Sequence, residues 1–394
     1  MKKILFIGHD ANRAGAQIVL LHLMKQLRQH GYQMHLLLGN GGELMQEYGE
    51  IASVAILPQT NSTHKKGFIK RILGLLRLKA SLEKRHLSRF RQYLESHHFD
   101  LIFVNTIASA KYFRQIDDLQ LPVVMFAHEL EMSIQKYCTP DDLTYLMGRT
   151  HHLMAVSKAV ADYYHNTYDY PLAQISTLQI IDIPSILNKL SDAKKTNIRQ
   201  QHGLPPDAIL VGGCGHAEWR KGNDVFMFLA QEVIKKAKDK PVYFVWVGMK
   251  PDTEWYQIQR FDAKRLGLSD KIIHVNLTEN VFSYLSQLDI FVLTSREDPY
   301  PLVVLEAALA QKPIVCFDQS GGAPELVEDD AGFVVPYLDI IQMTEKVLQL
   351  IEKPDLCSIM GDRAYEKVLL RHEINTNVER VIKIIEKIPN KPNL

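Results

Sequence analysis

The feature that most constrains this chain is a unit of one strand followed by one helix, which occurs in both halves. A short apolar run at 4–7 leads through a loop at 8–15 into an amphipathic helix that ends at 30–31. In the second half, the run at 209–213 leads through a glycine-containing loop into a helix at 223–237. Strands that are apolar throughout are typical of parallel sheets with helices on both faces. We therefore predict an α/β fold with doubly wound sheets.

The remaining apolar runs extend this scheme in both halves. They lie at 34–38, 101–104, 123–126, 153–156, 241–247, 271–275, 289–294 and 313–317. A chain of 394 residues is too long for one ordinary core, and the pattern breaks at Pro184 before a charged stretch. We expect an N-terminal Rossmann-like domain at 1–185, a second at 189–372 and a helix at 373–394 that packs back on the first. Two such domains would place a ligand cleft between the carboxyl ends of their strands.

Charge and cysteine content exclude several classes of function. The chain has 46 Lys and Arg against 45 Asp and Glu, a net charge of +1, which gives no indication of a nucleic-acid partner. Its four cysteines form no C-x-x-C pair, so neither a disulfide framework nor a zinc site is expected. The apolar run at 4–7 is too short for a signal peptide, and no run has the length of a membrane span. These features favour a cytoplasmic protein.

The segment from Lys65 to Arg91 combines basic and apolar residues. It contains ten Lys or Arg and a single acid, Glu83, interleaved with leucines, isoleucines and phenylalanines. A basic amphipathic helix suits an anionic membrane surface, and it equally suits a helix packed on the first sheet with a solvated basic face. The first alternative would place the protein peripherally on the inner face of the membrane.

The densest chemical signal lies between Thr294 and Glu325. A loop with two prolines leads into a helix, whose first N–H groups are then available to a phosphate. Asp298 lies in the loop and Glu306 about two turns inside the helix, so both carboxylates can face one ligand. Gly321-Gly322 allows close backbone approach and positive φ opposite them.

These motifs resemble the large retaining glycosyltransferase family of GT-B fold, called family 4. The resemblance rests on an acid, seven residues and then Glu306, followed by Ala-Ala-Leu-Ala-x-x-Pro-Ile-Val and Gly-Gly-x-x-Glu. It extends over most of the chain through Gly15, His128, Ala155-Val156-Ser157-Lys158 and Arg220-Lys221-Gly222. Each motif alone is weak evidence, whereas the ordered set is strong.

The resemblance implies a role for each matching residue. Glu306 would bind the ribose of a nucleotide diphosphate-sugar donor, and Asp298, with Glu297 beside it, would contact the transferring sugar. Lys221 and Arg220 would neutralise the diphosphate, and His128 would lie near the reacting sugar. The backbone that completes the phosphate pocket, with the first loop facing substrate, would come from Tyr300, Pro301, Leu302, Val303 and Gly15.

Three positions depart from the family pattern. The first acid is usually Glu and is Asp298 here, and a Gly-x-Gly turn is replaced by Tyr300-Pro301. The arginine that usually precedes the Lys-Gly pair by five residues is His216, so Arg220 would supply the missing charge. No metal and no cofactor are expected, because the Asp-x-Asp pair that holds a divalent ion in the other major glycosyltransferase fold is absent.

The predicted function is metal-independent, retaining transfer of a sugar to a glycan or a lipid-linked saccharide. One alternative is a catalytically inactive protein of the same fold that binds sugar nucleotides or glycans, which Asp298 and His216 motivate. A nicotinamide-dependent dehydrogenase is a third reading. It rests only on glycine-rich loops, and the first loop lacks the Gly-x-Gly-x-x-Gly spacing.

Overall fold

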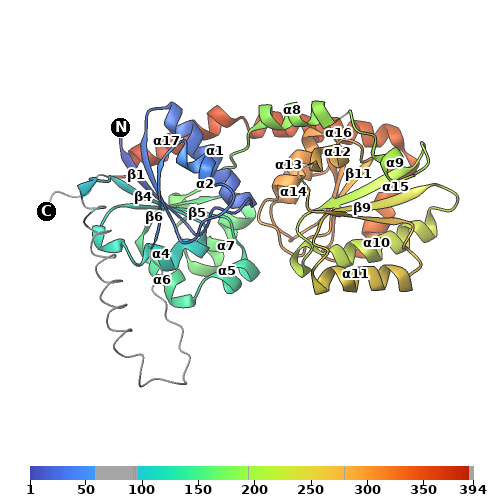
Figure 1. Cartoon of the computed structure of the whole chain (residues 1–394), viewed down its shortest axis with the longest axis horizontal. Helices are drawn as coiled ribbons and strands as arrows, with labels where there is room; N and C mark the ends of the chain where they lie inside the picture. Colours follow the sequence, from blue (N-terminus) through green and yellow to red (C-terminus); the bar gives the residue numbers. More distant parts are fainter. Residues whose placement is uncertain (58–91, 93, 95, 194, 279, 390–394) are drawn as a thin grey trace, which may run out of the picture. The chain divides into compact units, whose positions relative to one another are not determined.

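The computed structural model describes residues 1–57, 92, 94, 96–193, 195–278 and 280–389 (Figure 1). Contacts divide the chain into two compact units. The first comprises Met1–Ala155, Tyr164–Leu178 and Val378–Leu394, and the second comprises Val156–Tyr163 and Gln179–Asn377. The basic segment from Lys65 to Arg91 lies outside the described residues, so its predicted membrane contact stays a prediction.

The first unit is built on a seven-stranded sheet in the order β3-β2-β1-β4-β5-β6-β7, with every pair parallel. The strands are β1 (Lys3–Gly8), β2 (Gln33–Leu38), β3 (Ser53–Ile56), β4 (Leu101–Asn105), β5 (Val123–Ala127), β6 (Thr150–Ala155) and β7 (Ile175–Thr177). The central strands β4 and β5 are buried at every position. Helices cover both faces of the sheet (Figure 1), which explains why these strands are apolar throughout.

The second unit contains a six-stranded parallel sheet in the order β10-β9-β8-β11-β12-β13. The strands are β8 (Ile209–Cys214), β9 (Val242–Met249), β10 (Ile272–Asn276), β11 (Ile290–Leu293), β12 (Ile314–Phe317) and β13 (Gly332–Val335). Alternate residues enter two separate cores: Val245 and Phe291 belong to one, and Phe244 and Val292 to the other. The predicted pair of doubly wound α/β sheets is therefore confirmed.

The helices of each unit pack on the faces of its sheet. In the first unit they are α1 (Gly15–Gln29), α2 (Met45–Gly49), η1 (Ile107–Ser109), α4 (Ala110–Phe113), η2 (Asp117–Leu119), α5 (Glu131–Tyr137), α6 (Pro140–Arg149), η3 (Leu172–Gln174) and α17 (Ile374–Lys387). Helix α7 (Lys158–Tyr168) has residues in both units, and so does α17, whose residues up to Asn377 belong to the second unit. In the second unit they are α8 (Ile183–Ala193), α9 (Ile198–Gln201), η4 (Trp219–Lys221), α10 (Asn223–Lys236), α11 (Glu254–Arg265), α12 (Val281–Leu285), α13 (Leu302–Leu309), α14 (Ala323–Val327), α15 (Ile340–Glu352) and α16 (Pro354–Arg371).

Helix α17 joins the first unit although it comes last in sequence. Its apolar residues Val378, Val381 and Ile385 are fully buried. The Lys2 ammonium donates to the Ile385 carbonyl at 2.9 Å, and the Tyr32 hydroxyl donates to Glu386 at 2.6 Å. These contacts tie the two ends of the described chain to one sheet. No helix in the described part of the chain is long and apolar enough to cross a bilayer.

Candidate functional site

Two glycines decide how the loops of the second unit meet. Gly222 has φ +67°, and a Cβ there would lie 1.9 Å from the Thr294 carbonyl oxygen. Gly321 has φ +131°, and a Cβ there would lie 1.8 Å from the Asp298 carbonyl oxygen. Only glycine combines positive φ with such close approach at low cost. The first contact places Lys221 beside the loop after β11, and the second confirms the predicted close approach of Gly321.

Asp298 is the centre of a charged cluster in this loop. Its side chain is nearly buried, and it forms an ion pair with Lys221. Lys221 and the Ser295 hydroxyl, the latter at 3.2 Å, both donate to Oδ2 of Asp298. Its Oδ1 lies 3.7 Å from an Arg220 guanidinium nitrogen. The Asp298 carboxylate therefore has cations on both oxygens. Lys221 and Arg220 thus meet at one carboxylate, at the carboxyl ends of β8 and β11.

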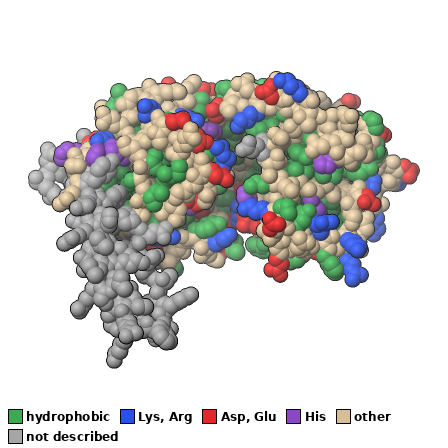
Figure 2. Space-filling model, viewed as in Figure 1, with side chains coloured by type: hydrophobic (Ala, Val, Ile, Leu, Met, Phe, Trp, Pro, Cys, Tyr) green, Lys and Arg blue, Asp and Glu red, His purple; other side chains and the backbone are tan. Residues whose placement is uncertain are grey.

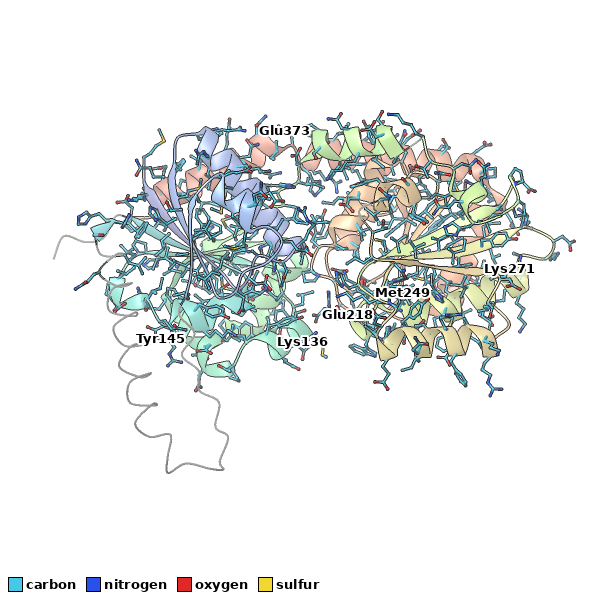
Figure 3. All side chains as sticks on the ribbon, in the orientation of Figure 1. Lys136, Tyr145, Glu218, Met249, Lys271 and Glu373 are labelled. Carbon is cyan, nitrogen blue, oxygen red and sulfur yellow. The ribbon has the colours of Figure 1, made fainter. Side chains whose placement is uncertain are left out.

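Arg220 is held by several acceptors at once. It donates to the backbone carbonyl of Glu297 at 2.8 Å and lies 3.3 Å from the carboxylate of Glu218, labelled in Figure 3. The neighbouring His216 is exposed, and desolvation followed by the charge of Lys250 lowers its pKa. A neutral His216 supplies no charge near pH 7, so the cluster depends on Lys221 and Arg220 for its cations.

Arg296 fixes the same loop and was not among the predicted site residues. Its guanidinium makes two hydrogen bonds of 2.9 Å to the Asp224 carboxylate and a third, of 2.7 Å, to the Trp219 carbonyl. Its backbone N–H also donates to the Arg220 carbonyl at 2.8 Å. Bidentate pairs of this kind hold geometry as well as charge. Arg296 therefore positions the strand-end loop against η4.

Glu306 lies on α13, which begins after Pro301 without a side-chain cap. Its carboxylate is half-buried, and burial raises its pKa to about 7 while the charge of Lys189 opposes that shift. Within the described residues, the carboxylate accepts no hydrogen bond. Cys214 is near both Glu306 and Lys221: its pKa is raised to about 12 by burial and by the charge of Glu306, and the charge of Lys221 opposes that shift. The unpartnered acid and the cations thus share one edge of the sheet.

The Tyr300-Pro301 turn contributes a side-chain contact to α16 and leads into the first turn of α13. The Tyr300 hydroxyl lies 2.9 Å from Nε2 of His372, and the two rings are stacked. Leu302 and Val303 are the first residues of α13, and their N–H groups have no acceptor among the residues described. Tyr300 therefore packs its side chain towards the end of α16, while the start of α13 offers backbone donors.

Glu325 has a structural role within the second unit. Its carboxylate accepts the backbone N–H groups of Lys158 and Ala159, at 2.9 and 2.8 Å. This caps the first turn of α7. Lys158 itself pairs with Asp162 one turn along the same helix.

In the first unit, His128 lies at the end of β5. Its Nε2 is 3.0 Å from the Asn105 amide oxygen, and its ring packs on Phe126. Burial, with the neighbouring His9, lowers the His128 pKa to about 3, so the ring is neutral near pH 7. Gly15 is exposed and is the first residue of α1. Sequence reasoning assigned no role to the polar residues around His128, although Glu129 directly follows it.

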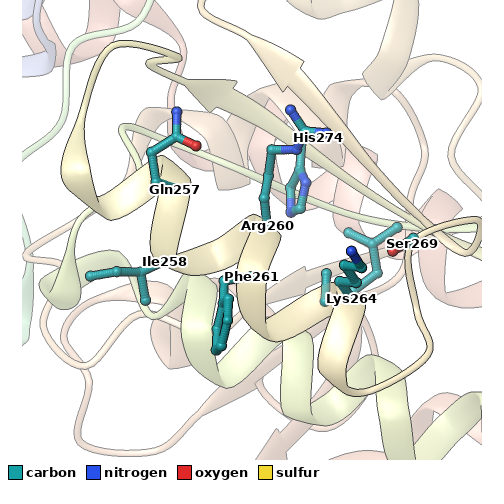
Figure 4. A pocket seen from close by; sticks show the side chains of 9 residues that line it. Gln257, Ile258, Arg260, Phe261, Lys264, Ser269 and His274 are labelled. Atoms are coloured by element: carbon teal, nitrogen blue, oxygen red, sulfur yellow. The ribbon is translucent and has the colours of Figure 1, made fainter.

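A surface hollow of about 650 Å³ lies elsewhere in the second unit (Figure 4). It is lined by residues of α11 such as Gln257, Arg260 and Phe261, together with His274 of β10. No predicted site residue lines it. In the described residues, no group of three or more His, Cys, Asp or Glu is placed to hold a metal ion, and metal independence stays a prediction.

Each of the two units contains a parallel sheet of its own, and comparisons with known proteins identify the fold. Residues 13–179 match the family model described as Glycosyltransferase Family 4, and residues 194–367 match Glycosyl transferases group 1. One model matches in each half of the chain, and together with the structural neighbours they show a GT-B glycosyltransferase fold. Crystal structures of Anabaena HepE with UDP, and with UDP and glucose, superpose with TM-scores of 0.78 and 0.77 at 19% and 18% identity. Each alignment covers 98% of this chain and all of that one.

Curated relatives are similar over shorter stretches. The alpha-D-kanosaminyltransferase of Streptomyces kanamyceticus is 25% identical over 205 residues, half of each chain. The N-acetyl-alpha-D-glucosaminyl L-malate synthase of Bacillus anthracis is 29% identical over 175 residues, 44% of each chain. The chain thus spans half or less of the length of these relatives, so their similarity bears on the fold and leaves the substrates to be proposed.

Proposed function

We propose that this protein is a retaining glycosyltransferase that moves a sugar from a nucleotide diphosphate-sugar to a glycan or lipid-linked saccharide. The observation that carries the proposal is that the Glu306 carboxyl group, which accepts no hydrogen bond within the described residues, lies at the same sheet edge as Lys221 and Arg220, whose nitrogens only donate. A nucleoside diphosphate carries the complement of both, namely ribose hydroxyls and phosphate oxygens.

Each residue then has a chemical task. Glu306 accepts the ribose hydroxyls, and the N–H groups at the start of α13, on Leu302 and Val303, donate to phosphate oxygens. Lys221 and Arg220 stabilise the charge that builds up on the leaving diphosphate. In the free protein, Asp298 keeps both cations in place, and in the complex it contacts the transferring sugar.

The transfer balances without a protein base. The bond between the anomeric carbon and the leaving diphosphate breaks, and a new bond forms to the acceptor hydroxyl oxygen on the same face. The acceptor proton passes to the departing phosphate. Retention, metal independence and the His128 contact with the reacting sugar rest on the family resemblance. The membrane-bound acceptor rests on the sequence of 65–91.

The deciding experiment is calorimetric titration of the whole chain with UDP, GDP, ADP, CMP and NAD, without metal. UDP is the first probe because UDP is bound in the HepE structures. We expect E306A to weaken binding of the preferred diphosphate by about 1–3 kcal/mol, the cost of leaving ligand hydroxyls unpaired. The matched control is E345A, which removes an exposed carboxylate on α15 and is expected to bind normally.

Turnover separates the alternatives. Release of the nucleoside diphosphate from its sugar conjugate, in the presence of EDTA and with retained configuration in the product by NMR, supports the proposal. Tight nucleotide binding without transfer or hydrolysis would make the protein an inactive binding protein. Affinity for NAD alone would return the dehydrogenase reading, and unchanged affinity in E306A would remove Glu306 from the site.

A further inference from the structure

A surface hollow of about 530 Å³ in the first unit has no role in the function proposed above. It is lined by residues of β6, β7, η3 and α17 and by the two residues that follow α17. Three of the lining residues are basic, namely Arg380, Lys383 and Lys387, and two are histidines, His151 and His152. Among the described residues that line the hollow there is no Asp or Glu. This composition favours an anionic ligand.

The three basic residues lie on one face of α17, because their spacing of three and four residues is about one helical turn. Lys383 and Lys387 are exposed, and within the described residues neither ammonium group has an ion-pair or hydrogen-bond partner. Like charges four residues apart destabilise a helix. The cluster therefore costs stability in the free protein, and a bound anion would remove that cost.

A β-bulge brings both histidines to the hollow. Consecutive residues of a regular strand point to opposite faces of the sheet, yet His151 and His152 line the same hollow. Val123 of β5 pairs with Thr150, and the next residue, Val124, pairs with His152, so His151 is the extra residue of a bulge in β6. Bulges of this kind turn a side chain to a new direction and are common beside functional sites.

A backbone group of β5 determines which nitrogen of His151 carries the hydrogen. Nδ1 of His151 accepts the Val123 N–H at 3.1 Å, so the ring hydrogen is on Nε2. The His151 side chain is exposed, and within the described residues its Nε2 has no acceptor. Nε2 of His152 lies 2.9 Å from the Ser176 hydroxyl, and burial lowers the His152 pKa, so that ring is neutral near pH 7. His151 can therefore donate a hydrogen bond to a ligand in the hollow.

The remaining lining suits an organic group beside the anion. The Arg380 guanidinium donates to the Thr177 carbonyl at 2.8 Å, which holds it beside the edge strand β7. Ile384, Ile388 and Pro389 add apolar surface. Sites for small organic molecules have volumes of about 300–1,000 Å³, and this hollow falls within that range. It has room for a phosphate group together with the group that carries it.

We propose that this hollow binds the phosphate group of a small organic phosphate or of a lipid head group. A phosphate monoester has a charge of about −1.5 to −2 near pH 7 and three acceptor oxygens, which matches a cluster of several cations better than a single carboxylate does. Lys383 and Lys387 neutralise this charge, Arg380 donates to the phosphate oxygens, and His151 adds a further hydrogen bond. The inference does not depend on glycosyl transfer, because no residue of the proposed nucleotide site takes part.

The soluble source is tested by NMR of the whole chain labelled with ¹³C at histidine, titrated with glycerol 3-phosphate at constant ionic strength. The ring resonance of His151, identified by its loss in H151Q, should shift saturably in the wild type and in K383R. K383Q and K387Q should each weaken the affinity about tenfold, the effect of one lost hydrogen bond to a charged group. The control K25Q removes an exposed lysine of α1 and should bind as the wild type does.

The lipid source is tested by sedimentation with vesicles of phosphatidylcholine and phosphatidic acid in equal parts, since phosphatidic acid carries the same glycerol phosphate group. If the ligand is a lipid, K383Q and K387Q should lower vesicle binding about tenfold relative to K25Q, and K383R should restore it. The segment 65–91 is unchanged in all of these variants, so it cannot cause the difference. Unchanged vesicle binding, with a lysine-dependent shift of His151, would assign a soluble phosphate.

The proposal is overturned where glycerol 3-phosphate leaves the His151 resonance in place and vesicle binding is the same in K383Q, K387Q and K25Q. It is also overturned where K25Q weakens both kinds of binding as much as K383Q, which would indicate a general effect of net charge. A wild-type chain that neither binds a nucleotide nor transfers a sugar contradicts the proposed function and leaves the result at this hollow standing.

Discussion

At the scale of single residues, the candidate site separates charges that are paired from one that is not. Asp298 is paired with Lys221 and Arg220. Glu306 is half-buried and accepts no hydrogen bond within the described residues. Burying an ionisable carboxyl group without a hydrogen-bond partner costs folding free energy. Such residues are common at functional sites.

The pH dependence of stability tests the state of Glu306. Burial raises its pKa from 4.5 to about 7, so the folded protein binds the proton more tightly than the unfolded chain. Its stabilising contribution is complete below pH 4.5 and is lost as the pH rises through 7. E306Q should therefore match the wild type near pH 4 and be more stable by about 1–3 kcal/mol at pH 8, the lower figure allowing for solvent contact. Urea unfolding at both pH values measures the difference, and an equal gap at both would contradict the raised pKa.

At the scale of elements, turns that only glycine can form decide where the site residues lie. The helical turn η4 ends at Gly222 in the left-handed region, and the Thr294 hydroxyl donates to the Gly222 carbonyl at 2.8 Å. This brings the end of β11 against η4 and places Lys221 beside Asp298. The pair is 77 residues apart in sequence, so the local backbone conformation controls a long-range contact.

Replacing Gly222 tests this control. G222A combines an unfavourable φ with a Cβ 1.9 Å from the Thr294 carbonyl oxygen, so it should destabilise the fold by about 2 kcal/mol or more. G148A is the matched control, because Gly148 lies in α6 with open space around its Cβ position, and alanine favours helices by up to about 1 kcal/mol. Thermal unfolding compares the two variants. Equal melting temperatures would show that the turn tolerates a side chain.

At the scale of the whole molecule, each unit has its own sheet and its own buried residues. The second unit has two cores, one on each face of its sheet, and the first unit includes α17 from the far end of the chain. On the face shown in Figure 2, acidic and basic side chains are interspersed, in keeping with a net charge of +1. The charges expected to bind a nucleotide ligand are therefore the local ones around Asp298, at the ends of strands.

Hydrogen exchange of the whole chain tests where a nucleotide acts. UDP at 100 times its dissociation constant should stabilise its binding unit by about 2.7 kcal/mol. Exchange should slow most in the loops after β8 and β11 and at the start of α13, and little in α17. Equal slowing in α17 would contradict a nucleotide site built on the second unit.

The residues themselves allowed the α/β class and most of the strands to be predicted, because burial on both faces requires continuous apolar runs such as 101–104 and 290–293. The edge strands β3, β7 and β13 were missed, since they are short and only partly buried. Motif spacing also indicated Asp298, Glu306 and Lys221.

Only the tertiary structure decided which of these groups are paired. The Lys221–Asp298 ion pair, the Arg296–Asp224 ion pair and the Thr106–His9 hydrogen bond each join residues far apart in sequence. Sequence periodicity reports which face of an element is buried, because burial is a property of each residue. Hydrogen-bond partners and shifted pKa values depend on distances and desolvation between elements, and those exist only once the sheets have formed.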